Sequence, residues 1–203
     1  MIAKKFKFDY KQYLTKQSAI IAAVLIVIIF FIYMIQGGLF AKATVVDGMS
    51  DQYIMVFKSM DGSYGKSSKV SNEICNWLES ADIEVFETLS YYFDDPMEED
   101  TEDLRYIAGC TMGRNDYERL DFVMNKYSVE MFFPVRSIAI TLPSTNKFSK
   151  LMGVLKAYPK LGRYREKKQY PKNAFLKVVD IKKKEATYLM PIQEGFDAVG
   201  RYH

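Results

Sequence analysis

The longest apolar stretch of the sequence lies close to its N-terminus. Residues 19–35 carry no charge, and their only hydroxyl group is that of Tyr33. A helix over residues 18–40 would extend roughly 34 Å at about 1.5 Å per residue, enough to cross a hydrocarbon core of about 30 Å. The pattern predicts one transmembrane helix over residues 18–40, preceded by a basic leader at residues 1–17.

A cleaved signal peptide is the alternative interpretation of this segment. Ala41-Lys42-Ala43 has the small-x-small form of a cleavage site. The apolar run is, however, about twice as long as the ~7 to 15 residues usual in a signal peptide, so we favour a retained anchor. Five lysines and one aspartate precede the apolar run, and the positive-inside rule then keeps the N-terminus cytoplasmic. The folded domain is expected outside, in a periplasm, a lumen or the extracellular space.

Beyond the apolar run, the spacing of apolar residues changes between strand and helix periods in a repeated order. A strand, a turn, a helix and two further strands are predicted, and the same order then occurs again. In the first half the expected elements are a strand at 53–58, a helix at 66–80, and strands at 88–93 and 104–112. In the second half they are a strand at 137–142, a helix at 147–157, and strands at 174–179 and 186–190.

The predicted fold is therefore α+β. Two β-α-β-β repeats form a mostly antiparallel sheet with helices on one face, because neither repeat alone covers its part of the sheet. The domain is expected over residues 41–192, with a cleft between its halves, and a C-terminal tail over residues 193–203.

The net charge of +3 conceals two oppositely charged halves. Residues 42–122 carry a net charge of −11 and residues 123–203 a net charge of +10. The acidic run 94–103 and the basic runs 160–172 and 182–184 are interpreted as solvated loops and a hairpin tip. No nucleic-acid recognition motif accompanies the basic half, so no nucleic-acid partner is expected.

Composition excludes several classes of enzyme. Two cysteines, Cys75 and Cys110, and one histidine, His203, cannot provide four ligands for a structural zinc ion or a buried Cys/His catalytic pair. The sequence contains no glycine-rich phosphate loop and no G-x-S-x-G elbow. We expect no metal, no cofactor and no catalytic residue.

Three segments carry a resemblance to a known family. Ser63-Tyr64-Gly65 follows a predicted strand, residues 90–96 read SYYFDDP, and residues 104–110 read LRYIAGC. In order and spacing they resemble the GyrI-like small-molecule-binding domain, in which a G-x-Y-G-type turn precedes the first helix, a Y-x-D-x-P motif ends a strand and an arginine opens the next. The resemblance covers about residues 45–192 and implies an effector-binding fold.

An anchor placed before such a domain is similar to the arrangement in the testis-expressed ER-phagy receptor and its bacterial relatives. The likeness continues at residues 164–168 and at Tyr170-Pro171. The receptor carries its autophagy-adaptor motif in a long disordered tail, whereas only twelve residues follow Pro191 here. That function is not transferred to this chain.

The resemblance also implies a ligand pocket with a changed charge. Many family members place a glutamate on the penultimate strand, where it meets cationic ligands or acts as a base in members that hydrolyse cyclopropanoid compounds. The best match to that glutamate here is Lys177, which favours a neutral or anionic ligand. The expected pocket residues are Tyr64, Trp77, Tyr92, Tyr164 and Lys177, and Phe133 and Tyr170 are further aromatic candidates.

Other residue types are assigned structural roles. Asp94 and Asp95 are adjacent and point apart at a strand end, so we expect turn capping and not a shared-proton pair. Arg105 is expected to pair with the acidic run. Cys75 and Cys110 are interpreted as buried free thiols, with a disulfide as the alternative if their Cα atoms lie within ~7 Å.

Three functions remain open at this point. The first is a membrane-anchored protein that binds an amphipathic or aromatic small molecule. The second is a membrane-tethered adaptor whose domain binds a protein partner. The third is a GyrI-like hydrolase, which Lys177 at the glutamate position disfavours.

Overall fold

The structure, a computed structural model, describes residues 10–94 and 99–194. The leader lysines up to Lys7, residue Asp95 and most of the tail lie outside the described residues. The helices are α1 (Tyr10–Gln36), α2 (Ser67–Ser80), α3 (Leu120–Met124) and α4 (Lys147–Lys168), with short 3-10 turns at Tyr64–Lys66 and Arg114–Arg119. The strands are β1 (Val46–Met49), β2 (Tyr53–Asp61), β3 (Val85–Tyr92), β4 (Arg105–Met112), β5 (Ser128–Phe132), β6 (Arg136–Pro143), β7 (Phe175–Asp180) and β8 (Glu185–Pro191).

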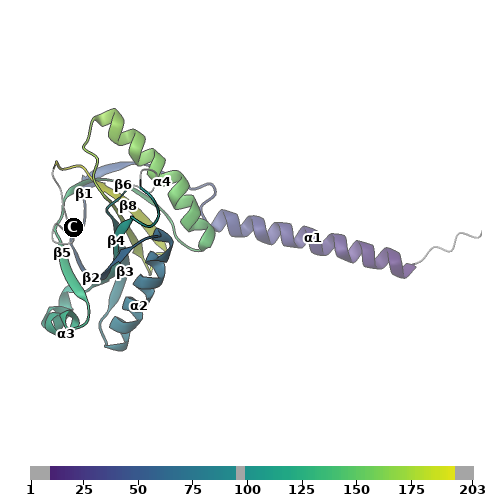
Figure 1. The fold of residues 1–203 in the computed structure, drawn as a ribbon. Coiled ribbons are helices and arrows are strands. Elements are labelled where there is room, and N and C mark those ends of the chain that lie inside the picture. The colour runs from purple at the N-terminus through teal and green to yellow at the C-terminus, as the bar shows by residue number, and fades with distance from the viewer. Residues whose placement is uncertain (1–9, 95–98, 195–203) are drawn as a thin grey trace, which may run out of the picture.

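All eight strands belong to one antiparallel sheet, in the order β1-β6-β8-β7-β3-β4-β2-β5. The predicted α+β fold is confirmed, with α2 and α4 on one face of the sheet (Figure 1). The helix α1 projects away from the domain. Its segment Gln17–Gln36 has a mean hydropathy of 3.0, and none of it is buried against the domain, so it is long and apolar enough to span a bilayer.

The sheet curves strongly because short links join strands that lie at its opposite ends. Residues 50–52 join β1 to β2, and residues 133–135 join β5 to β6. The two links are hydrogen-bonded to each other: Ser50 N donates to Val135 O at 2.9 Å, and Val135 N donates to Ser50 Oγ at 3.0 Å. The sheet therefore has a concave inner face and a convex outer face.

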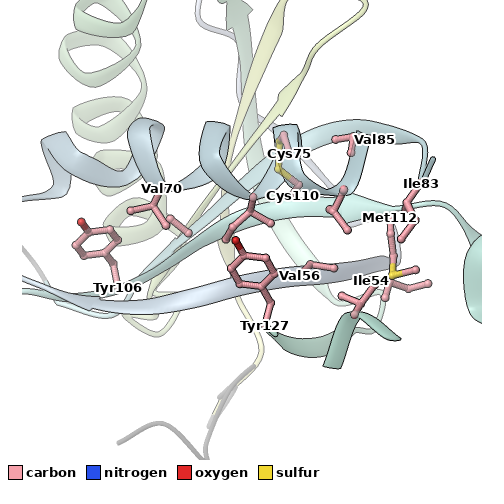
Figure 2. Packing of buried hydrophobic residues seen from close by; sticks show 14 of the residues in the cluster. Ile54, Val56, Val70, Cys75, Ile83, Val85, Tyr106, Cys110, Met112 and Tyr127 are labelled. Carbon is pink, nitrogen blue, oxygen red and sulfur yellow. A yellow bond between two sulfur atoms is a disulfide. The ribbon is translucent and has the colours of Figure 1, made fainter. Parts of the chain in front are cut away.

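Each face of the sheet has its own apolar core. The inner face packs a cluster centred on Met55, Phe57 and Tyr91, together with Leu176 and Val178 of β7. The outer face packs beneath the two helices, with one cluster under α2 and one under α4. Figure 2 shows the α2 cluster, in which Val70 and Cys75 point from the helix towards the strands. Strand residues therefore alternate between the two cores.

The cysteine prediction was wrong. Cys75 of α2 and Cys110 of β4 form a disulfide, with Cα atoms 5.7 Å apart (Figure 2). Thirty-five positions separate the two residues. The sequence could not establish this distance, because it depends on where α2 crosses β4.

Four elements differ from the sequence-based prediction. The four-residue β1 is exposed throughout, and β5 pairs only with β2, so neither edge strand shows a clear alternation of apolar residues. The short helix α3 was likewise not predicted. The helix α4 continues through Pro159 to Lys168, beyond the predicted end at 157, because its buried stripe continues to Leu161. Packing of that stripe outweighs the hydrogen bond that proline removes.

Removal of the disulfide should destabilise the domain. For the double variant Cys75→Ala/Cys110→Ala we expect the free energy of unfolding to fall by about 3 kcal/mol, because a cross-link that closes a loop of this size restricts the unfolded chain. Denaturant unfolding of the full chain measures the change. Two freely alkylatable thiols in the oxidised, folded protein would contradict the pairing.

Candidate functional site

The two halves of the domain meet along a line between α2 and α4. The helix α2 contacts β3 and β4, whereas α4 contacts β6 and β8. Since β7 lies between β8 and β3 in the sheet, it runs beneath the boundary between the two helices. We call this boundary the interhelical seam. It is defined by Ser67 and Ser68 of α2, Lys150 and Tyr158 of α4, Ser90 of β3, Lys177 of β7 and Tyr188 of β8.

Lys177 lies on the helix-covered face of β7. Its neighbours Leu176 and Val178 pack into the inner core, while Phe175 and Val179 pack against the clusters under the helices. Strand alternation therefore directs Lys177 towards the seam. Its register partners are Ser90 on one side and Tyr188 on the other.

The environment of Lys177 disfavours its positive charge. Burial, with a smaller contribution from the positive charge of Lys150, lowers the pKa of Lys177 to about 8. Within residues 10–94 and 99–194, no carboxylate forms an ion pair with Lys177. The seam therefore holds a partly buried ammonium group whose charge is not compensated by a described acidic side chain.

Tyrosines lie on both sides of the seam. Tyr158 of α4 packs edge-on against Tyr188 and against Phe175, with ring centroids 5.6 and 4.6 Å apart. On the other side, Tyr92 packs against Tyr64 at 4.5 Å and shares a hydrogen bond of 3.2 Å with the hydroxyl of Ser67. Burial raises the pKa of Tyr92, Tyr158 and Tyr188, so all three are neutral hydrogen-bonding groups at neutral pH.

A polar contact joins the two helices across the seam. Lys150 Nζ of α4 donates to Ser68 Oγ of α2 at 3.1 Å. One helical turn after Ser67, Ser71 is almost fully buried, and its Oγ has no hydrogen-bond partner among the described residues. A buried hydroxyl without a partner is unfavourable by about 1 to 3 kcal/mol. The first turns of α2 thus place the serines Ser67, Ser68 and Ser71 near the seam, and apolar residues follow later in the helix.

Close packing of α4 on the sheet fixes the seam. A side chain at Gly153 would overlap the hydroxyl group of Tyr188. Glycine is therefore required at this point of the helix, although glycine lowers helix propensity. The small residue allows α4 to approach β8 closely enough for Tyr158 and Tyr188 to meet.

The structure brings only part of the predicted pocket together. Tyr64, Tyr92 and Lys177 lie at or beside the seam. Trp77 lies on the other side of α2, where it stacks on Phe122 at 5.4 Å and meets Tyr127 edge-on.

Three other aromatic candidates are also away from the seam. Tyr164 lies in the last turns of α4, beneath Lys168. Tyr170 donates a hydrogen bond to Asp47, and Phe133 is 68% exposed in the link before β6.

The structural roles predicted for Asp94 and Arg105 are confirmed. Arg105 donates through Nη2 and Nε to the two carboxylate oxygens of Asp94, at 2.8 and 3.2 Å, and its backbone N–H donates to Asp94 Oδ2 at 2.6 Å. The hydroxyl of Tyr64 donates to the backbone carbonyl of Asp94 at 2.7 Å. Tyr64, Asp94 and Arg105 therefore join the end of β3 to the start of β4 beside the seam.

Sequence reasoning missed Ser67, Ser90, Lys150, Tyr158 and Tyr188. Their convergence depends on which helix face meets the sheet, and this is a tertiary property. One signal was present in the sequence: Gly153 interrupts an otherwise helix-favouring segment, which indicates a close approach of another group.

A cavity of about 260 Å³ lies away from the seam, between the β2 and β4 ends and the start of β3. Its lining includes Tyr53, Glu87 and Arg114. Burial, followed by repulsion from Asp180 and Asp51, raises the pKa of Glu87. This recess is open to solvent at the end of the sheet, and none of the residues predicted from the sequence lines it.

Comparisons with known proteins agree on the fold. No family model matches the sequence, and no curated protein matches it either. Among solved structures, the EcmrR C-terminal domain has a TM-score of 0.53 at 11% identity, over 74% of this chain and 98% of that chain. The EcmrR–DNA complex has a TM-score of 0.54 at 12% identity, over 90% of this chain and 69% of that chain. A hydrolase encoded by lin2189 from Listeria innocua has a TM-score of 0.52 at 7% identity, over 76% of this chain and 95% of that chain.

These likenesses show a fold shared with GyrI-like effector-binding domains. The identities are too low to transfer site residues. None of the comparisons supports the likeness to the ER-phagy receptor.

The charge of Lys177 should reduce stability at neutral pH. Because its folded-state pKa of about 8 is lower than the ordinary value of 10.5, the unfolded chain binds the extra proton between these values, and stability rises with pH across that window. Lys177→Met should therefore raise the free energy of unfolding by about 1 to 3 kcal/mol at pH 7. The gain should shrink as the pH rises from 8 towards 10.

Denaturant unfolding at a series of pH values measures this effect. The matched control is Lys69→Met, which alters an exposed lysine of α2. A gain that is equal for both variants, or that is independent of pH, would contradict a partly buried, uncompensated Lys177.

Proposed function

We propose that this chain is a membrane-anchored protein whose GyrI-like domain binds a neutral or anionic amphiphilic or aromatic small molecule at the interhelical seam. The observation that carries the proposal is the partly buried Lys177 without an acidic partner among the described residues, in the strand beneath the boundary of the two helices. A ligand carboxylate or sulfonate would supply the missing charge. Tyrosine rings on both sides would contact its apolar part.

Ligand entry requires the seam to open. The rings of Tyr158 and Tyr188 pack against each other, and Lys150 contacts Ser68 across the top. A single hydrogen bond between exposed side chains is a weak closure, worth about 1 kcal/mol or less. We infer that an amphiphile displaces the Lys150–Ser68 contact and exposes Lys177 and the hydroxyl groups of α2.

A hydrolase activity is disfavoured by the same residue. The position matched to the family's glutamate holds Lys177, which is mostly protonated at neutral pH with a pKa of about 8. A protonated amine cannot accept a proton as a general base. The alternative to a small-molecule ligand is a protein partner on the same domain. Binding of a small amphiphile by the purified full chain, without any other protein, distinguishes the two functions.

Two features support an outward-facing domain. The helix α1 satisfies the length and hydropathy of a membrane span. Independently, the Cys75–Cys110 disulfide is typical of domains in oxidising compartments, because the cytosol keeps thiols reduced. We infer that α1 is retained as the anchor and that the domain lies in a periplasm, a lumen or the extracellular space.

Ligand charge should decide binding at the seam. We expect the full chain in nanodiscs to bind decanoate more tightly than decyltrimethylammonium, which has the same chain length and the opposite charge. Two unit charges about 4 Å apart interact by roughly 4 kcal/mol at an effective dielectric constant of 20, before screening. Lys177→Glu should therefore reverse the preference by roughly tenfold or more in Kd, or about 1.4 kcal/mol.

Titration calorimetry, corrected for empty nanodiscs, measures both constants. Lys160→Glu, which makes the same charge change at an exposed position of α4, should leave the preference unaltered. If the wild-type chain binds neither probe, the adaptor function gains support. If Lys177→Glu and Lys160→Glu behave alike, binding does not occur at Lys177.

Topology is tested separately from ligand binding. In inverted inner-membrane vesicles from a bacterial host, the domain should be protected from added protease, and the full-length chain should stay in the pellet after carbonate extraction. Opening the vesicles with detergent provides the control. A soluble form that begins at Thr44 would establish cleavage after Ala43. Digestion of the domain in sealed vesicles would show that it faces the cytoplasm and would contradict the proposed orientation.

A further inference from the structure

The end of α1 and the loop after it are hydrogen-bonded to the first half of α4 and to the loop before α4. Lys156 Nζ donates to the carbonyl oxygens of Gly38, Leu39 and Ala41, at 2.8, 2.7 and 3.0 Å. From the loop before α4, Thr145 Oγ1 donates to Gln36 O at 2.8 Å. The Thr145 bond satisfies a carbonyl group that the end of a helix leaves without a partner, and Lys156 binds the loop that follows.

Further contacts complete this junction. Asn146, which also caps α4, donates through Nδ2 to Tyr33 O at 3.1 Å. Gly38 has a φ of +86°, which favours glycine, and a side chain at Gly37 would approach Phe148 Cδ1 to 2.7 Å. The backbone thus turns sharply after α1 and brings the N-terminal turns of α4 to the end of the membrane helix (Figure 1).

One aromatic contact sets the depth of this junction. Phe40 folds back beside Phe31, with ring centroids 6.4 Å apart. Phe31 lies five residues before the end of α1, inside the apolar segment. When α1 spans a bilayer, the 68% exposed ring of Phe40 therefore lies at the depth of lipid chains. The start of α4, which is bound to the same loop, then lies at the membrane interface.

The exposed side of α4 changes character along its length. Leu151, Val154 and Leu155 are 51 to 57% exposed in the first half of the helix, next to α1. The exposed positions of the second half are Pro159 and the polar residues Lys160, Arg163, Glu166, Lys167 and Lys168. The exposed leucine and valine side chains of α4 are thus confined to the part of the helix that lies beside the membrane helix.

Basic side chains border the apolar group. Lys147 and Lys150 are exposed in the first turn of α4. Through the Lys150–Ser68 contact, the exposed Lys66 and Lys69 at the start of α2 lie nearby. Leucine and valine side chains bordered by lysines are typical of helices that lie in the headgroup region of anionic bilayers. We call the surface formed by Phe40, Lys147, Lys150, Leu151, Val154 and Leu155 the membrane-proximal face.

We propose that the membrane-proximal face docks on the bilayer that α1 crosses. Phe40, Leu151 and Leu155 insert at the boundary between headgroups and acyl chains, and Lys147 and Lys150 contact the phosphates of anionic lipids. This inference rests on the proposed anchor function of α1, but it is independent of any ligand at the seam. The domain is then held on the membrane in one orientation, with the N-terminal ends of α2 and α4 towards the lipid.

Tryptophan fluorescence in lipid vesicles tests this docking. The full chain with Trp77→Phe has no tryptophan, because Trp77 is the only one in the sequence. Into this background, single reporters are placed by Leu151→Trp on the membrane-proximal face, Phe31→Trp in α1 and Ile181→Trp in the β7–β8 turn. Ile181 is the matched distal control, because it is 42% exposed and lies far from α1. The next residue of its turn, Lys182, donates a hydrogen bond to Glu84, which lies beyond the C-terminal end of α2.

Each variant is reconstituted in vesicles of phosphatidylcholine and phosphatidylglycerol, with or without acyl chains brominated near the headgroup. We expect the Phe31→Trp and Leu151→Trp variants to lose most of their fluorescence to the brominated lipid, and the Ile181→Trp variant to keep it. Loss of fluorescence at position 31 but not at position 151 overturns the docking while α1 is inserted. If neither position loses fluorescence, α1 does not insert in the bilayer, and the result contradicts both the proposed anchor and the docking.

Two further arms identify the occupant of the face. A reporter at position 151 that is shielded from both brominated lipid and aqueous iodide would mean that a protein or a second copy covers the face, which overturns the proposal. Adding Lys147→Glu/Lys150→Glu should decrease quenching at position 151 in the anionic vesicles, whereas Lys160→Glu/Lys167→Glu should not. Equal quenching in both backgrounds overturns the contact with anionic lipid.

Discussion

Closure of the sheet determines the rest of this domain. The strands β1 and β5 are at opposite ends of the sheet, yet links of three residues join each of them to the strand beside the other. The two hydrogen bonds between Ser50 and Val135 therefore bring the two ends together. A sheet curved in this way has room on its inner face only for strand side chains, so both helices must pack on the outer face. There they leave one strand, β7, beneath their boundary.

Much of this arrangement follows from the sequence, for physical reasons. The strands that carry the core were predictable from their apolar residues, but the sequence could not tell which face of β7 carries Lys177, because a shift of one residue along a strand reverses the faces. The N-terminus of α4 was also predictable, because Asn146 and Ser149 form a capping box that is local in sequence. Features set by close neighbours along the chain can therefore be predicted from the sequence alone.

The remaining features depend on contacts between distant segments. The disulfide joins residues 35 positions apart, and it forms only because α2 crosses β4 at Cys110. Trp77 was a reasonable aromatic candidate, but helix rotation places it towards α3 and not towards the seam. Tyr158 and Tyr188 belong to no recognisable motif. Their position at the seam is set by the packing of α4 on the sheet, so the sequence did not indicate them.

The rotation of α4 about its own axis links the seam to the membrane-proximal face. Its buried stripe consists of Ser149, Gly153, Ala157 and Leu161, and the first three are small. Because Gly153 fits against Tyr188, the helix has one rotational setting, and a shift by one residue would turn it by about 100°. Such a turn would remove Tyr158 from the seam, Lys156 from the end of α1 and Leu151 from the outer side together. One glycine contact therefore holds three surfaces of the same helix in register.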